Sequence, residues 1–317
     1  DADTNNDGEI QFTEAEAVLR LHTNNKNIAS LQGIHRFLNL LELHFALNDI
    51  ENIDISVLSN LELLNCISNP LSMVDLSNNV NLKILGCDNT SVTSLDLSQN
   101  VNLEELYLRD NLLNQLDVTQ NPNLILINCS YNQIENLDTS QNPALEILVC
   151  DFNEIIALDV SQNTQLIRLN ATNNQLTSLN IKNGFNNIMT KMLVVENPDL
   201  ECIQVDNVVY ANNQICNGTS SLGWCKDITA FYSEDCTLGS EGNELTTRIS
   251  IYPNPVQNTL KIDSDILFDS VYIFSFKGQL IESNKRKEID VSKLSPGIYF
   301  AALKKDGQSV TKKFIKS

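Results

Sequence analysis

The 317-residue sequence has few basic residues, few glycines and few histidines. Lys and Arg number 21 against 40 Asp and Glu, and the formal net charge of −19 argues against binding to nucleic acid, because phosphates require a basic surface. The 11 glycines form no phosphate-binding loop, and the three histidines have no spacing typical of a catalytic base and its nucleophile. No run of about 20 apolar residues suggests a membrane-spanning helix. These absences favour a non-catalytic protein that does not span a membrane.

The charge is unevenly distributed along the chain. Residues 247–317 carry 12 basic and 7 acidic residues, whereas residues 1–246 carry 9 basic and 33 acidic residues. A chain of this length can form two or three units with substantial cores. We therefore expect an acidic module followed by a small basic one.

Leucine-rich segments repeat every 21 residues from about Leu40 to Leu179. One copy, LEELYLRDNLLNQLDVTQNPN, extends from Leu103 to Asn123, and its apolar positions recur one period earlier and one period later. A short fixed period indicates a solenoid, in which each turn buries its apolar residues only against its neighbours.

The pattern L-x-x-L-x-L-x-x-N-x-L in these copies resembles a leucine-rich repeat. At 21 residues it is similar to the short repeats of bacterial surface proteins such as internalins. The resemblance implies that each LxLxxN segment is a strand of a parallel sheet, and that the rest of the turn is loop or 3₁₀-helix on the convex side. The predicted fold is an α/β-type leucine-rich-repeat solenoid followed by a small C-terminal antiparallel β-sandwich.

Asparagine and cysteine recur in columns along the repeat. The asparagine amides are expected to turn inward and satisfy buried backbone groups, with Thr90 as an interruption. The cysteines share their column with Leu108 and Ala171, which predicts interior packing rather than a zinc site, with a strained disulfide as the alternative. The asparagines are Asn48, Asn69, Asn111, Asn132, Asn153 and Asn174, and the cysteines are Cys66, Cys87, Cys129 and Cys150.

A column of aspartates also recurs, each followed two positions later by Ser or Thr. Carboxylates stacked about 4.8 Å apart repel one another, so the column requires water, hydrogen bonds or cations. We expect Asx-type turns, and a row of weak calcium sites is the alternative. The members are Asp54, Asp75, Asp96, Asp117, Asp138 and Asp159.

Strand positions between the leucines are expected to face the concave surface, where solenoids usually bind partners. Tyr107 is the most evident aromatic anchor, and Asn128 and Ser130 are expected to point outward. The expected partner is an unknown extracellular protein or glycan, and a solvated face without a partner is the alternative. The candidate binding residues are Glu105, Tyr107, Arg109, Asn128, Ser130, Asp151, Arg168 and Asn170.

The chain begins with DADTNNDGEIQFTEAEA, inside a motif, so we expect a preceding N-terminal segment. Read from Asp3, the stretch fits the EF-hand loop D-x-[DN]-x-[DN]-G-x₅-E and predicts bound Ca²⁺. An acidic helix cap without metal is the alternative, and TEAEAVLRL is expected to form the helix that follows. The expected ligands are Asp3, Asn5, Asp7, the carbonyl of Glu9, Gln11 directly or through water, and Glu14.

Four further cysteines, Cys202, Cys216, Cys225 and Cys236, fall outside the 21-residue spacing, where a solenoid needs a C-terminal cap. We predict the disulfides Cys202–Cys236 and Cys216–Cys225, although the sequence alone permits three connectivities. Disulfides imply an oxidising location outside the cytoplasm. The segment from CIQVDN to YSEDC resembles the end of a Bacteroidetes repeat family, which supports the outer pair.

Short alternating strands separated by turn residues follow, which is typical of a small antiparallel sandwich. The motifs YPNP and LSPGIY and the basic ending KKFIK resemble the type A C-terminal sorting domain of the type IX secretion system. The resemblance implies a Bacteroidetes protein exported through the periplasm to the outer-membrane surface or the medium, with the secretion machinery and a sortase as partners. The motif residues are Tyr252, Pro253, Asn254, Pro255, Gly297, Tyr299, Lys312 and Lys313.

The sequence thus predicts a secreted, cell-surface-attached, non-catalytic binding protein similar to adhesins. The alternative is a structural or accessory subunit of an outer-membrane or surface-layer assembly. The expected domains are an EF-hand-like calcium loop and N-terminal cap (1–27), leucine-rich repeats (28–205), a disulfide-bonded cap (206–236), a linker (237–247) and the sorting domain (248–317).

Overall fold

The computed structural model of the chain describes residues 2–216, 223–236, 249–264, 267–276, 279–305 and 308–317. The expected linker, residues 237–247, lies outside these residues. The chain divides into two compact units, one of residues 1–200 and 214–226 and the other of residues 201–213 and 227–317. None of the helices in the described ranges is long and apolar enough to span a bilayer.

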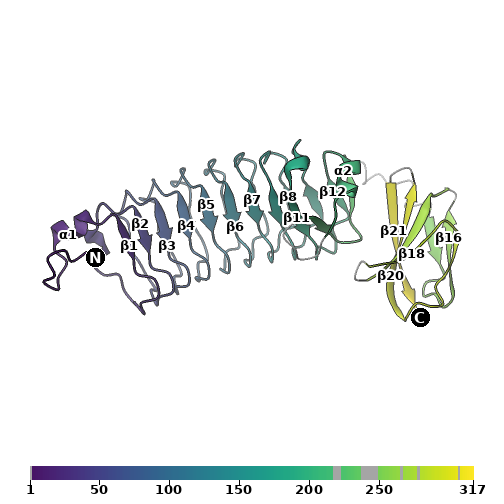
Figure 1. Cartoon of the computed structure of the whole chain (residues 1–317), viewed down its shortest axis with the longest axis horizontal. Helices are drawn as coiled ribbons and strands as arrows, with labels where there is room; N and C mark the ends of the chain where they lie inside the picture. The colour runs from purple at the N-terminus through teal and green to yellow at the C-terminus, as the bar shows by residue number, and fades with distance from the viewer. Residues whose placement is uncertain (1, 217–222, 237–248, 265–266, 277–278, 306–307) are drawn as a thin grey trace. The chain divides into compact units, whose positions relative to one another are not determined.

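The first unit is a solenoid built on one parallel sheet, with ten strands in the described part of the chain (Figure 1). Consecutive turns pair in register, so that Leu43, Leu64 and Leu85 are Cα partners. The predicted leucine-rich-repeat solenoid is therefore confirmed. In sheet order the strands are β1 (Arg20–His22), β2 (Glu42–His44), β3 (Leu63–Asn65), β4 (Ile84–Gly86), β5 (Glu105–Tyr107), β6 (Leu126–Asn128), β7 (Ile147–Val149), β9 (Arg168–Asn170), β11 (Lys191–Val194) and β13 (Gly223–Lys226).

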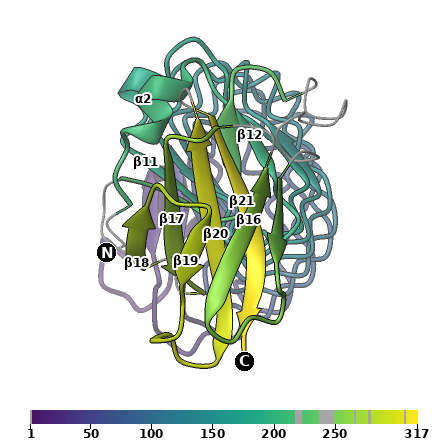
Figure 2. The same ribbon diagram turned by 90° about the vertical axis from the view of Figure 1, so that its right-hand side faces the viewer.

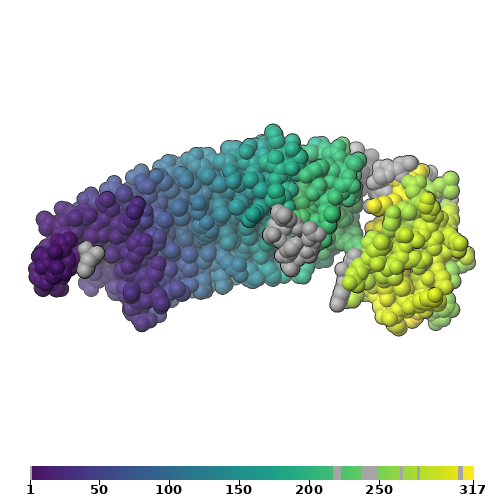
Figure 3. Space-filling view, in the orientation of Figure 1, coloured from purple at the N-terminus to yellow at the C-terminus, as the bar shows by residue number. Residues whose placement is uncertain are grey.

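The central residue of each three-residue strand from β2 to β9 in this sheet points into the interior. Leu106 and Leu148 have no exposed surface, whereas the residues that flank them in β5 and β7 are half-buried. Burying one such leucine contributes about 2 kcal/mol. In the space-filling view the turns of this unit lie against one another along the row (Figure 3). Each turn therefore depends on its neighbours for its core.

A column of buried asparagines, here called the strand-end ladder, closes the end of each strand. Asn132 shows the pattern: its Nδ2 donates to the carbonyl oxygens of Leu108 at 2.9 Å and Cys129 at 3.1 Å. Its Oδ1 accepts from the Leu113 N–H at 3.0 Å. The inward amides that the sequence predicts are confirmed, and the pattern recurs at Asn69, Asn111, Asn153 and Asn174.

A second asparagine column lies at another position of the turn and is fully buried. Nδ2 of Asn121 donates to the carbonyl oxygens of Leu97 at 3.0 Å and Asn100 at 2.9 Å, both in the preceding turn. Both columns therefore join neighbouring turns through backbone carbonyls. The second column consists of Asn79, Asn100, Asn121, Asn142 and Asn163.

The return segments, which carry the chain from one strand of the sheet to the next, are mostly loops, as predicted. Toward the C-terminal end, β8 (Ala157–Asp159) pairs in parallel with β10 (Ser178–Asn180). The 21-residue pattern does not predict this second sheet, because the same positions in earlier turns remain loop. The 3₁₀-helices are η1 (Ile34–Arg36) and η2 (Asn186–Ile188).

Helix α1 (Phe12–Ala17) follows the N-terminal loop and is shorter than the sequence predicts. The expected helix through Leu21 is wrong at its end, because Arg20–His22 forms β1 and pairs with β2. A short isolated helix is marginal, whereas pairing at the sheet edge satisfies the same backbone groups. The solenoid sheet thus begins within residues 1–27.

The four cysteines of the repeat are buried and free, in agreement with the predicted packing role. Sγ of Cys66 lies 2.6 Å from Sγ of Cys87 and 3.2 Å from the carbonyl oxygen of Gly86. Burial raises the pKa of Cys129 to about 12, so this thiol stays protonated at neutral pH. Protonated, buried thiols behave as small hydrophobic groups.

Two disulfides follow the repeats, and both are the pairs expected from the sequence. Cys202 is bonded to Cys236 with a Cα–Cα distance of 5.9 Å, and Cys216 to Cys225 with 4.8 Å. In the first unit, β13 joins the solenoid sheet beside β11, and the buried Trp224 donates through Nε1 to the Met189 carbonyl oxygen at 3.0 Å. The solenoid sheet therefore extends into the region expected to be a separate cap.

In the second unit, β12 (Cys202–Gln204) pairs in parallel with β14 (Phe231–Ser233). Helix α2 (Val208–Asn212) lies between them in sequence, and its N-cap residue Asn207 accepts from the Tyr210 N–H at 2.8 Å. An N-cap of this type stabilises a short helix by about 1 kcal/mol.

The C-terminal part of the second unit forms two antiparallel sheets, seen from another side in Figure 2. Their shared core includes Leu260, Val271, Ile289 and Phe314. The predicted antiparallel domain is confirmed. One sheet consists of β15 (Ile249–Tyr252), β16 (Thr259–Ser264) and β19 (Glu288–Asp290), and the other of β18 (Leu280–Asn284), β17 (Ser270–Ser275), β20 (Gly297–Lys305) and β21 (Gln308–Lys316).

Candidate functional site

The concave face of the solenoid is formed by the residues that flank the buried centre of each strand. In β5 these are Glu105 and Tyr107, which bond to each other: the Tyr107 hydroxyl donates to Glu105 Oε2 at 2.7 Å. Burial, followed by this hydrogen bond, raises the pKa of Tyr107 to about 12. The phenol therefore stays protonated at neutral pH and acts as a hydrogen-bond donor rather than as a base.

Arg109 and Asp88 meet on the concave face beyond the strand ends. The Arg109 N–H donates to Asp88 Oδ1 at 2.7 Å. Burial raises the pKa of Asp88 above its ordinary value, although this hydrogen bond opposes the shift. The guanidinium of Arg109 remains exposed and available to a partner.

Three of the predicted binding residues form one hydrogen-bonded group. The Ser130 hydroxyl lies 2.7 Å from Asn128 Oδ1 and 2.8 Å from Asp151 Oδ1. The Ser130 hydroxyl thus points toward residues of the concave face, as expected, but the side chain has no exposed surface, so the expectation that Ser130 contacts a partner is wrong. The cause is its small side chain, which the larger neighbours Asn128 and Asp151 cover. Ser130 orients these neighbours rather than contacting a partner.

The remaining predicted binding residues, Arg168 and Asn170, lie on β9. The register places β7 between β9 and β6, so the two residues lie beside the Ser130 group rather than within it. Arg168 is exposed, and Asn170 Oδ1 accepts from the Thr172 N–H at 3.3 Å. Among the candidate binding residues, Arg168 thus adds a second positive charge to that of Arg109.

An aromatic cluster, consisting of Arg109, Tyr131 and Phe152, adjoins these residues, and its two rings are missing from the sequence-based set. The two rings stack with centroids 4.3 Å apart, and the Arg109 guanidinium lies 4.7 Å from the centre of the Tyr131 ring. Tyr131 is 39% exposed and Phe152 is 38% exposed. Both have a positive φ directly before the ladder residues Asn132 and Asn153. Their 21-residue spacing is the sequence signal that predicts the stack.

The N-terminal loop is folded around its acidic side chains. Asp3 accepts from the N–H groups of Asp7 at 3.3 Å and Gly8 at 2.9 Å. Gly8 has a φ of 88°, in the left-handed region that favours glycine. Asn5 Oδ1 accepts from the Asp7 N–H at 2.9 Å, and Asp7 Oδ1 from the Glu9 N–H at 2.9 Å. These hydrogen bonds hold the oxygens of the expected ligands on one loop.

Glu14 folds back across this loop. Its Oε1 accepts from the Thr4 hydroxyl at 2.7 Å and the Thr4 N–H at 2.8 Å, and its Oε2 from the Gln11 N–H at 3.0 Å. The hydrogen bond from the Thr4 hydroxyl is the largest cause that lowers the pKa of Glu14, which is therefore ionised at neutral pH. The oxygen donor set fits a hard cation such as Ca²⁺.

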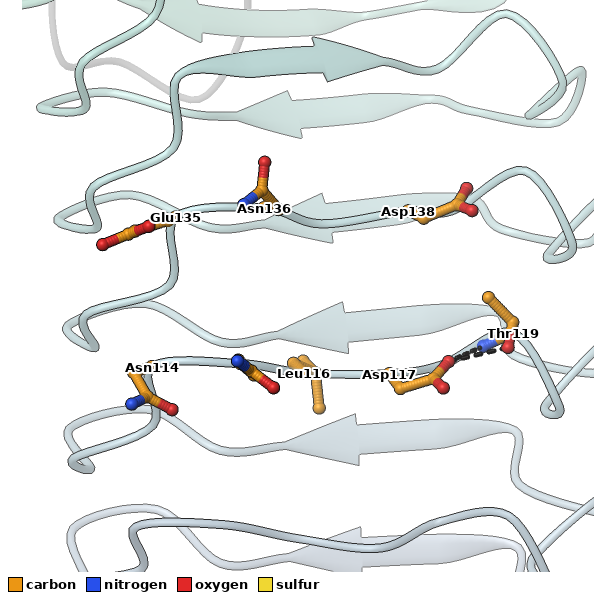
Figure 4. A pocket seen from close by; sticks show the side chains of 8 residues that line it. Asn114, Leu116, Asp117, Thr119, Glu135, Asn136 and Asp138 are labelled. Carbon is orange, nitrogen blue, oxygen red and sulfur yellow. Dashed lines mark hydrogen bonds between the residues drawn. The ribbon is translucent and has the colours of Figure 1, made fainter.

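The aspartate column forms Asx turns, as the sequence predicts. Asp117 Oδ1 accepts from the Thr119 hydroxyl at 2.7 Å and the Thr119 N–H at 2.9 Å, and the hydroxyl bond is the main cause that lowers the pKa of Asp117 (Figure 4). A depression of about 430 Å³ lies beside it, between two return segments, and is also lined by Glu135 and Asp138. The same backbone bond is made by Asp54, Asp75, Asp96, Asp138 and Asp159.

The YPNP motif joins the start of the C-terminal domain to its last strand. Asn254 Oδ1 accepts from the Ile315 N–H at 2.8 Å, and its Nδ2 donates to the Lys313 carbonyl oxygen at 3.3 Å. The peptide bonds Tyr252–Pro253 and Asn254–Pro255 are cis. The motif therefore pairs with β21 through a side chain rather than through a regular strand.

The other expected sorting residues lie on β20 and β21. Gly297 begins β20, and the Tyr299 hydroxyl donates to the Ser295 carbonyl oxygen at 2.9 Å. Lys312 and Lys313 lie next to each other on β21, and Lys313 is exposed. The motif residues thus combine a structural role with a basic strand near the C-terminus.

Comparison with known families identifies the C-terminal part of the chain. Residues 250–317 match a family model described as the secretion system C-terminal sorting domain. A comparison with curated proteins finds no match. The sorting domain supports type IX secretion, and it indicates export to the cell surface or the extracellular space.

Solved structures similar to this chain include bacterial proteins. The functional domain of InlJ from Listeria monocytogenes, which includes a cysteine ladder, is 22% identical with a TM-score of 0.39, over 61% of this chain and 56% of that domain. Internalin C2 from Listeria monocytogenes is 24% identical with a TM-score of 0.49, over 53% and 76%. The leucine-rich-repeat protein LIC12759 from Leptospira interrogans is 20% identical with a TM-score of 0.45, over 61% and 62%.

These likenesses are partial. The chain spans little more than half the length of the InlJ domain that it matches, and the TM-scores are below 0.5. The fold assignment therefore rests on the strand register and the 21-residue columns of this chain.

Proposed function

We propose that the protein is a secreted, cell-surface-attached binding protein, similar to adhesins, that recognises a protein or glycan through the concave face of its solenoid. The aromatic cluster carries this proposal. It places two exposed stacked rings and an exposed guanidinium next to the polar concave residues. Tyr and Arg are the residue types that contribute most often to binding hot spots, because they bury a large area and still form directed polar contacts.

The polar residues around the cluster would supply specificity. The buried Ser130 hydroxyl donates its one proton to Asn128 Oδ1 or to Asp151 Oδ1, so that the side chain it holds loses little freedom when a partner binds. Tyr107 is similarly oriented by Glu105. A preoriented polar face beside an apolar anchor is a common arrangement in binding sites.

The binding role predicts that the aromatic cluster is required for attachment. Replacing Arg109, Tyr131 and Phe152 by Ala in the full chain is expected to weaken binding at least about 30-fold, since one hot-spot residue contributes 2 kcal/mol or more. The measurement is binding to a glycan array and to a panel of immobilised extracellular proteins. Val80→Ala/Val101→Ala, which removes exposed apolar residues outside the strands, is the control and should leave binding unchanged. Equal binding by the triple variant would contradict the proposed role of this face.

The C-terminal domain would deliver this binding module to the surface. We propose that the type IX secretion machinery of a Bacteroidetes bacterium recognises residues 250–317, and that a sortase cleaves between the two modules. The family match and the basic strand β21 support this role. Attachment of the solenoid to the cell envelope would then follow cleavage.

We also propose that the N-terminal loop binds Ca²⁺ through Asp3, Asn5, Asp7, Glu9, Gln11 and Glu14. Binding stabilises the folded state by mass action, so chelation is expected to lower the melting temperature measured by circular dichroism. Glu14→Gln removes one carboxylate and should abolish this response, whereas Glu16→Gln, in the same helix but outside the loop, should retain it. Identical melting curves with and without chelator would contradict the calcium site.

A further inference from the structure

Two histidines and a glutamate meet at the N-terminal end of the solenoid sheet. They are His22 on β1 and Glu42 and His44 on β2, the first two strands in Figure 1. One ligand atom of each residue lies within 4.8 Å of those of the other two. In the described part of the chain, this is the one group of three His, Cys, Asp or Glu side chains whose ligand atoms lie so close together.

The parallel register produces this arrangement. His22 and His44 are Cα partners in adjacent strands, and their rings stack with centroids 4.2 Å apart and an interplanar angle of 11°. Glu42 precedes His44 by two residues, so both side chains project from the same face of β2. All three side chains therefore lie on the concave face of the sheet.

The cluster has one oriented carboxylate and one buried nitrogen without a partner. Arg20 Nε lies 2.9 Å from Glu42 Oε1, which leaves Oε2 facing His44 Nε2 at 3.6 Å. His44 Nε2 is buried and has no hydrogen-bond partner. A buried polar atom without a partner costs about 1–3 kcal/mol, so the fold retains an uncompensated donor or acceptor at this point.

The donor set is that of a transition-metal site. Two imidazole nitrogens and one carboxylate oxygen suit zinc, whereas calcium requires oxygen ligands. Ligand atoms about 2.0–2.1 Å from a tetrahedral zinc lie about 3.3–3.4 Å from one another, close to the 3.6 Å between Glu42 Oε2 and His44 Nε2.

The stacked rings set one geometric requirement. Two parallel rings cannot both point an in-plane nitrogen lone pair at one ion, so one ring must turn. His22 is exposed, and χ2 of histidine is a broad torsion, so the His22 ring can turn at little cost. Half-buried His44 and Glu42, held by Arg20, would form the fixed part of the site.

We propose that His22, Glu42 and His44 bind one zinc ion on the concave face, with a fourth coordination position open to solvent or to a partner. Three protein ligands and one open position are the arrangement of zinc sites that engage an external group. The site lies on strands β1 and β2, whereas the residues of the aromatic cluster follow strands β5, β6 and β7. It stands independently of the adhesin-like function.

Zinc binding to the full chain tests the site. The protein is freed of metal, transferred to buffer with excess Ca²⁺ so that the N-terminal loop does not compete, and titrated with ZnCl₂ in a calorimeter. One zinc per chain is expected. His22→Ala, His44→Ala and Glu42→Gln should each weaken binding by at least about 10-fold, because even a residue that only orients a ligand contributes this much. His35→Ala in η1 changes the third histidine of the chain and should have no effect.

A second readout separates ligation from folding. The histidine ring resonances in NMR spectra should shift for His22 and His44 on addition of zinc, and not for His35. His22→Ala carries the test even if His44→Ala lowers stability, because His22 is exposed and its loss should leave the melting temperature without zinc unchanged. Absence of zinc binding by the parent protein, or unchanged affinity of the His22→Ala/His44→Ala variant, would overturn the proposal.

Discussion

Removing residues 250–317 is expected to abolish appearance of the protein on the cell surface and in the medium, with the solenoid retained in the periplasm. The physical reason is that this segment forms a domain with its own hydrophobic core, so that its deletion removes a complete recognition unit. The solenoid itself should still fold, because its turns and its disulfide Cys216–Cys225 lie in a separate compact unit. Cell fractionation followed by immunoblotting measures the outcome.

Two finer variants separate the folding of the sorting domain from its charge. Asn254→Ala removes the hydrogen bonds to Ile315 and Lys313 and should release the end of β21, which lowers export. Lys312→Gln/Lys313→Gln keeps the strand and removes two positive charges. This variant should lower export only if the secretion machinery recognises the positive charge of β21. Undiminished secretion of the deletion variant would contradict the assignment of this domain.

Replacing Asn132 by Ala is expected to lower the free energy of unfolding by about 1–3 kcal/mol, since it leaves the buried Leu113 N–H without a partner, whereas the carbonyls of Leu108 and Cys129 keep a second donor in Asn111 and Asn153. The change removes the amide that serves the Leu113 N–H and the carbonyls of Leu108 and Cys129. Urea unfolding followed by circular dichroism measures the loss. Hydrogen exchange should locate it in the turns around β5 and β6, because solenoid turns interact only with their neighbours.

Two controls make this prediction specific to the strand-end ladder. Asn123→Ala removes an exposed amide with a single bond to the Val101 carbonyl at 3.1 Å and should change stability by no more than about 0.5 kcal/mol. Asn132→Thr should recover part of the loss, because Thr90 occupies the same column and donates to the Cys87 carbonyl at 3.2 Å. Equal stabilities of the Asn132 and Asn123 variants would contradict a structural role of the ladder.

The periodic features of this chain could be predicted from its sequence because each arises from a contact that recurs once in every turn. The inward asparagines, the packed cysteines and the Asx turns depend on groups within a turn or in the next one. A 21-residue period specifies those groups directly. The pairing of Cys202 with Cys236 was predictable for a different reason, namely the resemblance of that segment to a repeat-family end.

The features that could not be predicted depend on side-chain size and on the ends of the solenoid. The pattern places Ser130 on the concave face, but only its neighbours determine that it is covered. The helix expected through Leu21 ends at Ala17 because the first strand needs an edge to pair with. The proximity of His22 and His44 follows from a 22-residue spacing, which differs by one from the regular period, so the 21-residue pattern does not place the two histidines in one column.

The amide nitrogens of both asparagine columns donate to backbone carbonyls rather than to particular side chains, and this has an evolutionary consequence. A duplicated or deleted 21-residue unit would present the same amides to the same carbonyls, so every ladder bond could form again at the new junction. Gene duplication within the repeat can therefore lengthen or shorten the recognition face in steps of about 4.8 Å without a new core. Lineages that meet larger or smaller targets can adjust the reach of the molecule by whole turns, while its two ends stay unchanged.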